Sequence, residues 1–127
     1  MKSQPSLAIL LESGRHERAH FAFVLATGAA ALGRHVVLFA TNRGCQALFT
    51  DWSGLDDAER DARARTAGVA GLEELRAAAQ ELGVMLIACE AGMRAEGFEA
   101  ASLITGVSVA GIATFLEKAG DGAIVAL

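Results

Sequence analysis

Five short apolar segments, separated by longer stretches, constrain the fold more than any other feature of this chain. Residues 7–11, 36–40 and 84–88 contain no polar side chain, residues 107–110 form a weaker segment, and residues 123–127 form a fifth. Segments of this length that are apolar on both faces are typical of strands in a parallel sheet covered on both sides. The sequence therefore predicts an α/β protein with a mostly parallel five-stranded sheet.

The stretches between these segments show helical spacing. Apolar residues recur at helical intervals over residues 16–32, which end before Gly33, and over residues 72–82, which end before Gly83. Residues 112–119 predict a shorter helix. Alternation of strands and helices with right-handed crossovers gives a doubly wound fold of flavodoxin/Rossmann-like topology, with helices on both faces. At 127 residues, the chain suits a single domain over residues 1–127.

Residues 51–68 differ from the rest because they are crowded with acidic and basic side chains and include Trp52, the single tryptophan. One interpretation is a solvated helix or loop, which is the usual behaviour of mixed charge. The other is a charged insertion that acts as a lid or docks a partner, since it follows the second strand near the predicted site edge. The sequence leaves both open.

Charge and composition exclude several classes of function. The net charge of −4 argues against nucleic acid as the main partner, because phosphate binding needs a basic face. Two cysteines are too few for a disulfide scaffold. The apolar run 21–32 is too short to span a bilayer, and Arg34 and His35 follow it. We expect a cytoplasmic protein without a membrane span, whose thiols stay reduced.

Cys89 directly follows the third predicted strand, and residues 90–94 look like the start of a helix. A thiol at such a corner faces the positive end of the helix dipole, which stabilises a thiolate. Gly92 permits close approach of the backbone, so N–H groups there could hold an anionic sulfur. Glu90 opposes this effect, and Arg94 could offset it. The alternative is a buried structural cysteine.

Cys45 has a parallel position after the second strand, with Gly44 and Arg43 before it. Gly44 could open the next helix. If strands two and three both flank strand one, the two cysteines share an edge but need not touch. A direct disulfide requires Cα atoms within roughly 7 Å. A half-buried cysteine without a role is the alternative for Cys45.

Other site types have weaker support. His16 and His20 are spaced to face one ligand, but no CxxC or HExxH pattern supports a zinc site with the cysteines, and we expect no metal. His20 is also a candidate proton carrier near Cys89. Gly14, after the first strand, lies in neither a GxGxxG nor a P-loop pattern, and we expect no cofactor.

Three segments follow one another in the second half of the chain: Ile87–Met93 (IACEAGM), Leu103–Val107 (LITGV) and Ala110–Leu116 (AGIATFL). In this order they resemble the DsrE/DsrF-like sulfur-relay family. The front half is similar too, at Ser13-Gly14, at residues 28–33 and at residues 37–41. The resemblance covers nearly the whole chain outside residues 51–68.

This resemblance implies a compact subunit that assembles into homo-oligomers, often trimers or hexamers. It also implies that Cys89 carries sulfur as a persulfide between donor and acceptor proteins. Cys45 departs from the family, because similar sequences usually have a large apolar residue there. Independently, the first helix is apolar nearly all round, with Phe21 and Phe23 directed differently, which favours burial in a subunit interface.

Two hypotheses of different classes follow. The first is intracellular sulfur trafficking, in which Cys89 acts as a persulfide carrier or a sulfurtransferase, with Gly92, Arg94, Cys45, Gly44, His20 and Gly14 as supporting candidates. The second is a non-catalytic oligomeric module that binds a small ligand or a protein at the carboxyl edge of the strands.

Overall fold

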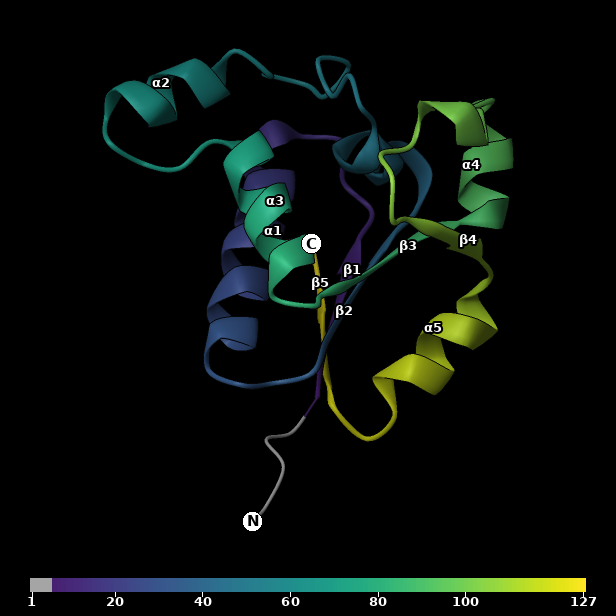
Figure 1. Ribbon diagram of the computed structural model, residues 1–127. Coiled ribbons are helices and arrows are strands. Elements are labelled where there is room, and N and C mark those ends of the chain that lie inside the picture. The colour runs from purple at the N-terminus through teal and green to yellow at the C-terminus, as the bar shows by residue number, and fades with distance from the viewer. Residues whose placement is uncertain (1–5) are drawn as a thin grey trace.

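The computed structural model describes residues 6–127, and a five-stranded sheet forms its centre (Figure 1). The strands are β1 (Leu7–Leu11), β2 (Val36–Ala40), β3 (Met85–Cys89), β4 (Ser108–Ala110) and β5 (Ala123–Ala126). The helices are α1 (His16–Ala31), α2 (Arg60–Thr66), α3 (Leu72–Glu81), α4 (Glu90–Glu96) and α5 (Ile112–Ala119), with 3-10 helices η1 (Asn42–Leu48) and η2 (Ala100–Ser102).

All neighbouring strands of the sheet are parallel, in the order β4-β3-β2-β1-β5. This confirms the predicted α/β fold and makes the sheet fully parallel. The strand order also shows where β2 and β3 lie relative to β1. Strand β2 lies between β1 and β3, so strands two and three are neighbours and do not both flank β1. The order reverses between β1 and β5.

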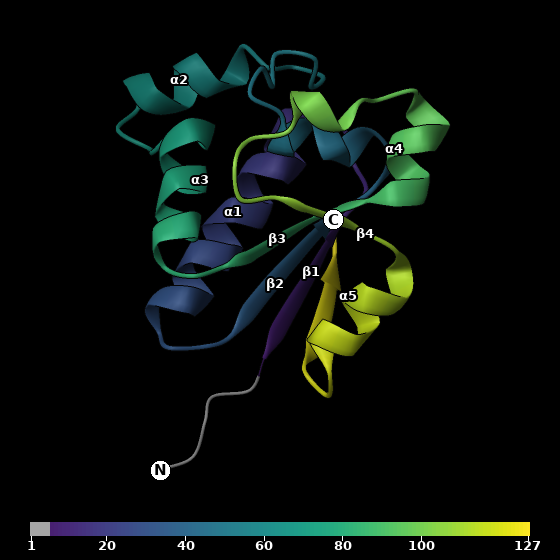
Figure 2. The ribbon, with the colours of Figure 1, turned by 45° about the vertical axis from the view of Figure 1, so that its right-hand side comes forward.

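Helices cover the two faces of the sheet unequally (Figures 1 and 2). Helices α1 and α3 pack side by side over one face, where the larger core cluster includes Phe23, Leu38 and Leu86. Within residues 6–127, α5 is the helix that packs on the other face, where Phe115 stacks on Phe39 with ring centroids 4.9 Å apart. Because one eight-residue helix covers that face, part of its apolar surface stays open.

The carboxyl ends of the strands gather the connecting segments that carry the candidate chemistry. Helices η1 and α4 begin there, after β2 and β3 respectively, and α2 lies beyond this end of the sheet, at the upper left of Figure 1. No helix within residues 6–127 combines the length and hydropathy that a membrane crossing requires.

Candidate functional site

Cys89 ends strand β3 and caps helix α4. Its backbone is extended, and its Sγ accepts a hydrogen bond from the backbone N–H of Gly92 at 3.3 Å. The first N–H groups of a helix have no partner within the helix, so a side chain at the N-cap position usually accepts from one of them. Here the acceptor is sulfur, and a thiolate is a better acceptor than a thiol. The first turn of α4 therefore directs a backbone N–H at the sulfur of Cys89.

Gly92 is needed for this geometry. A Cβ at position 92 would collide with the backbone N of Asn42 and with Oγ1 of Thr41. Helix α4 thus packs directly on the loop that follows β2, as its contacts with η1 also show. The close backbone approach anticipated at Gly92 is present, and its partner is the loop after β2.

The charged neighbours of Cys89 are paired with each other. Arg94 Nη2 lies 3.4 Å from Glu90 Oε1, one helical turn away, and both side chains are well exposed. Cys89 itself is 8% exposed and belongs to the core cluster on the α5 side, with Phe39, Ile87 and Phe115 among its members. The positive charge of Arg94 therefore lies next to the negative charge of Glu90 on the outer surface of α4.

Cys45 lies in a different environment. It is completely buried in the core cluster of the α1 and α3 side, and its Sγ donates to the carbonyl oxygen of Ala40 at 3.4 Å. Burial raises the pKa of the Cys45 thiol to about 12, so this thiol is protonated at neutral pH. Arg43, next to it in sequence, pairs with Asp56 at 2.9 Å on the surface. Cys45 behaves as a core residue.

Gly44 and Gly14 allow two other close approaches at this end of the sheet. A Cβ at Gly44 would collide with the carbonyl oxygen of Leu11, and the Gly44 N–H donates to Glu12 O at 3.1 Å. A Cβ at Gly14 would lie 2.7 Å from Cβ of Arg43. Both glycines therefore pack η1 against the loop after β1.

His16 and His20 face one another, with ring centroids 5.5 Å apart, but their hydrogen bonds go to Asp61 and Ala70. His16 Nε2 bonds to Asp61 Oδ1 at 2.8 Å, and His20 Nε2 donates to the carbonyl oxygen of Ala70 at 2.8 Å. The structure thus places His20 beside α2, where it forms no hydrogen bond with Cys89. In residues 6–127, no three His, Cys, Asp or Glu side chains come together as a metal site.

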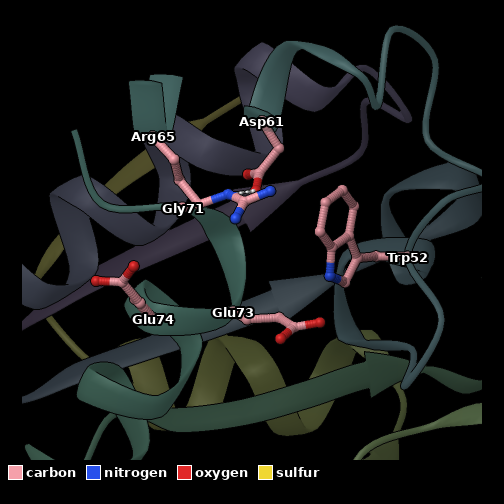
Figure 3. Close-up of a pocket in the computed structure, with 6 residues that line it drawn as sticks. All are labelled: Trp52, Asp61, Arg65, Gly71, Glu73 and Glu74. Atoms are coloured by element: carbon pink, nitrogen blue, oxygen red, sulfur yellow. Dashed lines mark ion pairs between the residues drawn. The ribbon is translucent and has the colours of Figure 1, made fainter. Parts of the chain in front are cut away.

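The charged segment 51–68 contains turns followed by α2, and Asp61 fixes it to the body of the protein. Asp61 is almost completely buried, and its Oδ1 accepts from His16 and from the backbone N–H of Leu72 at 2.8 Å. Its Oδ2 lies 3.4 Å from Nε of Arg65. Figure 3 shows this ion pair on one side of a pocket of about 190 Å³, with Trp52 facing it and Glu73 pointing toward the indole.

Several effects act on the pKa of Asp61. Burial is the largest and raises it, but the hydrogen bonds from His16 and from the Leu72 N–H, with the positive charge of Arg65, outweigh burial. The pKa of Asp61 therefore lies below its usual value, and the side chain is a carboxylate. Because a carboxylate only accepts, His16 Nε2 is the donor.

Sequence reasoning missed two buried charges that shape this end of the molecule. Asp61 was one of many charges in its segment, and nothing in the pattern distinguished it. Arg76 donates from Nη1 to the carbonyl oxygens of Ala47 and Phe49 and so holds the end of η1. A signal for Arg76 was present, because it shares a helical face with the buried residues Leu72 and Ala79.

Comparison with known proteins adds to this geometry. Residues 60–127 match the model of the DsrE/DsrF/DrsH-like family. The chain is also 31% identical to the sulfur carrier protein DsrE2 of Allochromatium vinosum, in an alignment that covers 95% of this chain and 96% of that protein. The family match includes Cys89, Gly92 and Arg94, whereas Cys45 lies outside it.

Two solved structures share the fold. The ychN protein from E. coli gives a TM-score of 0.73 at 12% identity, and a protein of unknown function, MTH1491 from Methanobacterium thermoautotrophicum, gives 0.65 at 16% identity. Each comparison covers 98% of this chain and 100% of the other. At these identities the likeness shows the fold alone.

Proposed function

The chain belongs to the DsrE/DsrF/DrsH-like family, and we propose that it works in sulfur trafficking, with Cys89 carrying sulfane sulfur as a persulfide between partner proteins. The sulfur-carrier name of its relative from Allochromatium vinosum supports the general role. The position of Cys89 within the matched residues 60–127 supports the choice of thiol. We place this activity in the cytoplasm, where thiols stay reduced.

The observation that carries the proposal is the hydrogen bond from the Gly92 N–H to Cys89 Sγ. It stabilises negative charge on the sulfur without an adjacent base, and the thiolate is the nucleophile in sulfur exchange. Cys45 is fully buried, and burial, which outweighs the backbone N–H groups near its sulfur, raises its pKa to about 12. Of the two thiols, Cys89 is the one suited to attack a donor.

The transfer is a pair of exchange reactions without net oxidation. The Cys89 thiolate attacks the outer sulfur of a donor persulfide, a sulfur–sulfur bond forms on Cys89, and the donor leaves as a thiolate. An acceptor thiolate then attacks the outer sulfur on Cys89, and Cys89 leaves as a thiolate. The terminal sulfur of the loaded protein is anionic, and N–H groups at the start of α4 stabilise it.

We also propose that the subunit assembles into a homo-oligomer, a trimer or a hexamer, through the open side of α5. Ile112 and Leu116 lie one turn apart on the outer face of α5 and are 53% and 52% exposed. Ile124 of β5 pairs with Ala8, whose side chain lies on the α5 side, and is also exposed. We call Ile112, Leu116 and Ile124 the α5 apolar surface; its burial against other copies removes apolar area from water.

We also propose that the first helix takes part in a subunit interface. Phe23 is fully buried under α1, whereas Phe21 is 54% exposed on the outside of that helix. The two phenylalanines do point in different directions.

In the proposed domain organisation, the chain is a single domain, and residues 51–68 form a charged lid. Asp61 fixes this lid to the rest of the domain.

Intact-mass spectrometry tests the proposed function directly. The purified protein is exposed to thiosulfate, to polysulfide and to a persulfidated donor protein, with and without prior alkylation. We expect the mass to rise by one sulfur atom, with the added sulfur on Cys89 in the peptide map. Cys89→Ser abolishes this shift, and Cys45→Ser, the matched control, retains it.

Wild-type protein that stays unmodified with all three donors would contradict the proposal. Together with unchanged assembly and ligand binding in Cys89→Ser, that result would favour the non-catalytic binding module instead. Circular dichroism of each variant establishes that the fold is intact, so that loss of loading reports on the thiol.

A further inference from the structure

Strand β5 forms one edge of the sheet, and within residues 6–127 no strand pairs with its outer side. It pairs with β1 in an unbroken parallel register from Ala123 to Ala126. Figure 2 shows it as the yellow strand beside β1. All of its residues except Val125 are exposed. An open edge of this kind presents backbone N–H and C=O groups to which a further strand can pair.

The backbone groups of Ile124 and Ala126 point to this open side. The Leu127 N–H donates to the carbonyl oxygen of Leu10 at 2.8 Å, so the backbone of Leu127 faces β1. Along a strand, the backbone groups of successive residues alternate between the two sides. Val125 therefore also faces β1, as its register with that strand requires. Ile124 and Ala126 each direct an N–H and a C=O away from β1.

Strand β5 lacks the features that usually protect a sheet edge. Proteins place Lys or Pro on such an edge, interrupt it with a β-bulge, or keep it very short. Residues 123–127 (AIVAL) contain no charge and no Pro, and the register with β1 has no bulge. The opposite edge strand, β4, is protected by its length of three residues. An apolar edge without protection indicates that another chain covers it.

This edge is complementary to itself. If two copies of β5 lie antiparallel with Val125 opposite Val125, Ile124 of each copy lies opposite Ala126 of the other. Residues opposite one another in a hydrogen-bonded antiparallel pair exchange both of their N–H···O=C bonds. The two pairs of Ile124 and Ala126 therefore satisfy every open backbone group that these residues present. A second copy of the chain fits the edge without any rearrangement of β5.

The symmetry of this pairing agrees with assembly through the α5 apolar surface. The two-fold axis between the antiparallel strands is perpendicular to the sheet, so both copies keep α5 on the same face of one continuous sheet. Ile124 contributes its side chain to the α5 apolar surface and its backbone to the open edge. Three copies can bury that surface around a three-fold axis and leave their β5 edges facing along this axis, toward a second trimer.

We propose that the outer edge of β5 pairs antiparallel with β5 of a second copy, and that three such pairings join two trimers into a hexamer. This inference rests on the trimer proposed above and goes beyond it, because it names the contact that turns a trimer into a hexamer. One contact between two strands is marginal in water. Three contacts between the same two trimers act together, since the first makes the others intramolecular.

Ala126→Pro tests the pairing. Proline at position 126 removes an N–H that faces away from β1, and an edge strand tolerates proline in that orientation. The bonds that this N–H makes across the two-fold axis are lost, and the proline ring obstructs the approach of the second strand. We expect multi-angle light scattering after size-exclusion chromatography to show a hexamer for the wild type and half that mass for Ala126→Pro. Ala126→Val is the matched control, because it keeps the N–H and favours a strand, and it should remain a hexamer.

Amide hydrogen exchange of the wild-type protein gives a second measurement, which needs no variant to fold. In the hexamer, we expect the amides of Ile124 and Ala126 to be protected to a degree similar to that of Val125, which bonds to β1 within the subunit. Amides of Ile124 and Ala126 that exchange as freely as exposed ones would overturn the pairing.

The measured masses separate this inference from the proposals on which it rests. A wild-type trimer, or an Ala126→Pro protein that stays a hexamer, would overturn the β5 pairing and leave the α5 apolar surface as the interface within the trimer. A monomeric wild type would overturn both. Loading of sulfur on Cys89 is measured separately, since β3 lies two strands away from β1 and takes no part in this edge.

Discussion

His16 Nε2 donates to Asp61 Oδ1 at 2.8 Å, joining two buried side chains that are 45 residues apart in the sequence. The same carboxylate oxygen accepts from the backbone N–H of Leu72, the first residue of α3. One buried carboxylate therefore connects α1, α2 and α3. This connection fixes the charged segment to the helices that cover one face of the sheet.

Loss of this carboxylate should destabilise the fold. Asp61→Ala leaves the His16 N–H and the Leu72 N–H buried without an acceptor, and we expect the free energy of unfolding to fall by about 3 kcal/mol. Urea denaturation followed by circular dichroism measures it. Asp57→Asn, which loses only the exposed pair with Arg63, should change it by about 0.5 kcal/mol or less. Similar losses in the two variants would contradict the role of Asp61.

The contribution of Asp61 should also depend on pH. Its pKa is lower in the folded protein than the value of about 3.9 in an unfolded chain. The stability it supplies is therefore fully present above about pH 4 and is lost as the pH falls through the folded pKa. We expect the difference in unfolding free energy between wild type and Asp61→Ala to be constant from pH 7 to pH 5 and to shrink below pH 4. If the difference in unfolding free energy between wild type and Asp61→Ala grew on acidification, this prediction would be contradicted.

The two thiols should differ in alkylation. At pH 8 a thiol with a pKa of about 12 is ionised in roughly one molecule in ten thousand, and Cys45 is in addition fully buried. We expect iodoacetamide to add one group to the folded protein, on Cys89, and two groups in guanidinium chloride. Peptide mapping of the product measures this. Modification of Cys45 in the folded protein at a rate similar to that of Cys89 would refute it.

Gly92→Ala tests the close packing of α4 on the loop after β2. The added Cβ collides with Thr41 and Asn42, so α4 must shift away from the loop after β2, which disturbs the hydrogen bond from the residue-92 N–H to Cys89 Sγ. We expect a loss of about 2 kcal/mol in unfolding free energy and slower loading of sulfur on Cys89. Gly28→Ala, on the exposed side of α1 where a Cβ meets no atom within 4 Å, should instead stabilise the protein by roughly 0.5–1 kcal/mol.

Leu116→Lys tests the α5 apolar surface as the interface between copies. A charge at its centre should dissociate the proposed trimer or hexamer into monomers, because an unpaired ammonium is costly to bury. Multi-angle light scattering after size-exclusion chromatography measures the mass. Leu32→Lys, at the exposed end of α1, should leave the mass unchanged. An oligomer that survives Leu116→Lys and fails with Leu32→Lys would move the interface to α1.

The elements of the fold could be read from the sequence because their signals are local. Strands 7–11 and 36–40 and helix 112–119 have the bounds that their apolar patterns predict, and the remaining predicted strands and long helices agree to within one residue at each end. The position of Cys89 at the start of a helix was predicted for the same reason. Strand, thiol and glycine are adjacent in the chain.

Features that depend on distant pairings could not be read in this way. The partner of His20 is Ala70, 50 residues away, and no spacing rule identifies it. The pair between Arg94 and Glu90, by contrast, joins residues one turn apart on one helix, and the sequence analysis expected Arg94 to offset Glu90. The burial of Cys45 depends on how η1 packs against β1, which Gly44 allows but does not specify.

The hydrogen bond between Gly92 and Cys89 has a practical consequence. Because the Gly92 N–H donates to the sulfur, a chemical change at that sulfur alters the magnetic environment of this amide. The Gly92 cross-peak in a nitrogen–proton correlation spectrum is therefore an intrinsic reporter of the state of Cys89. The relative populations of the free, loaded and alkylated forms can then be followed in one sample, without a probe attached to the thiol, while a donor or acceptor protein is added.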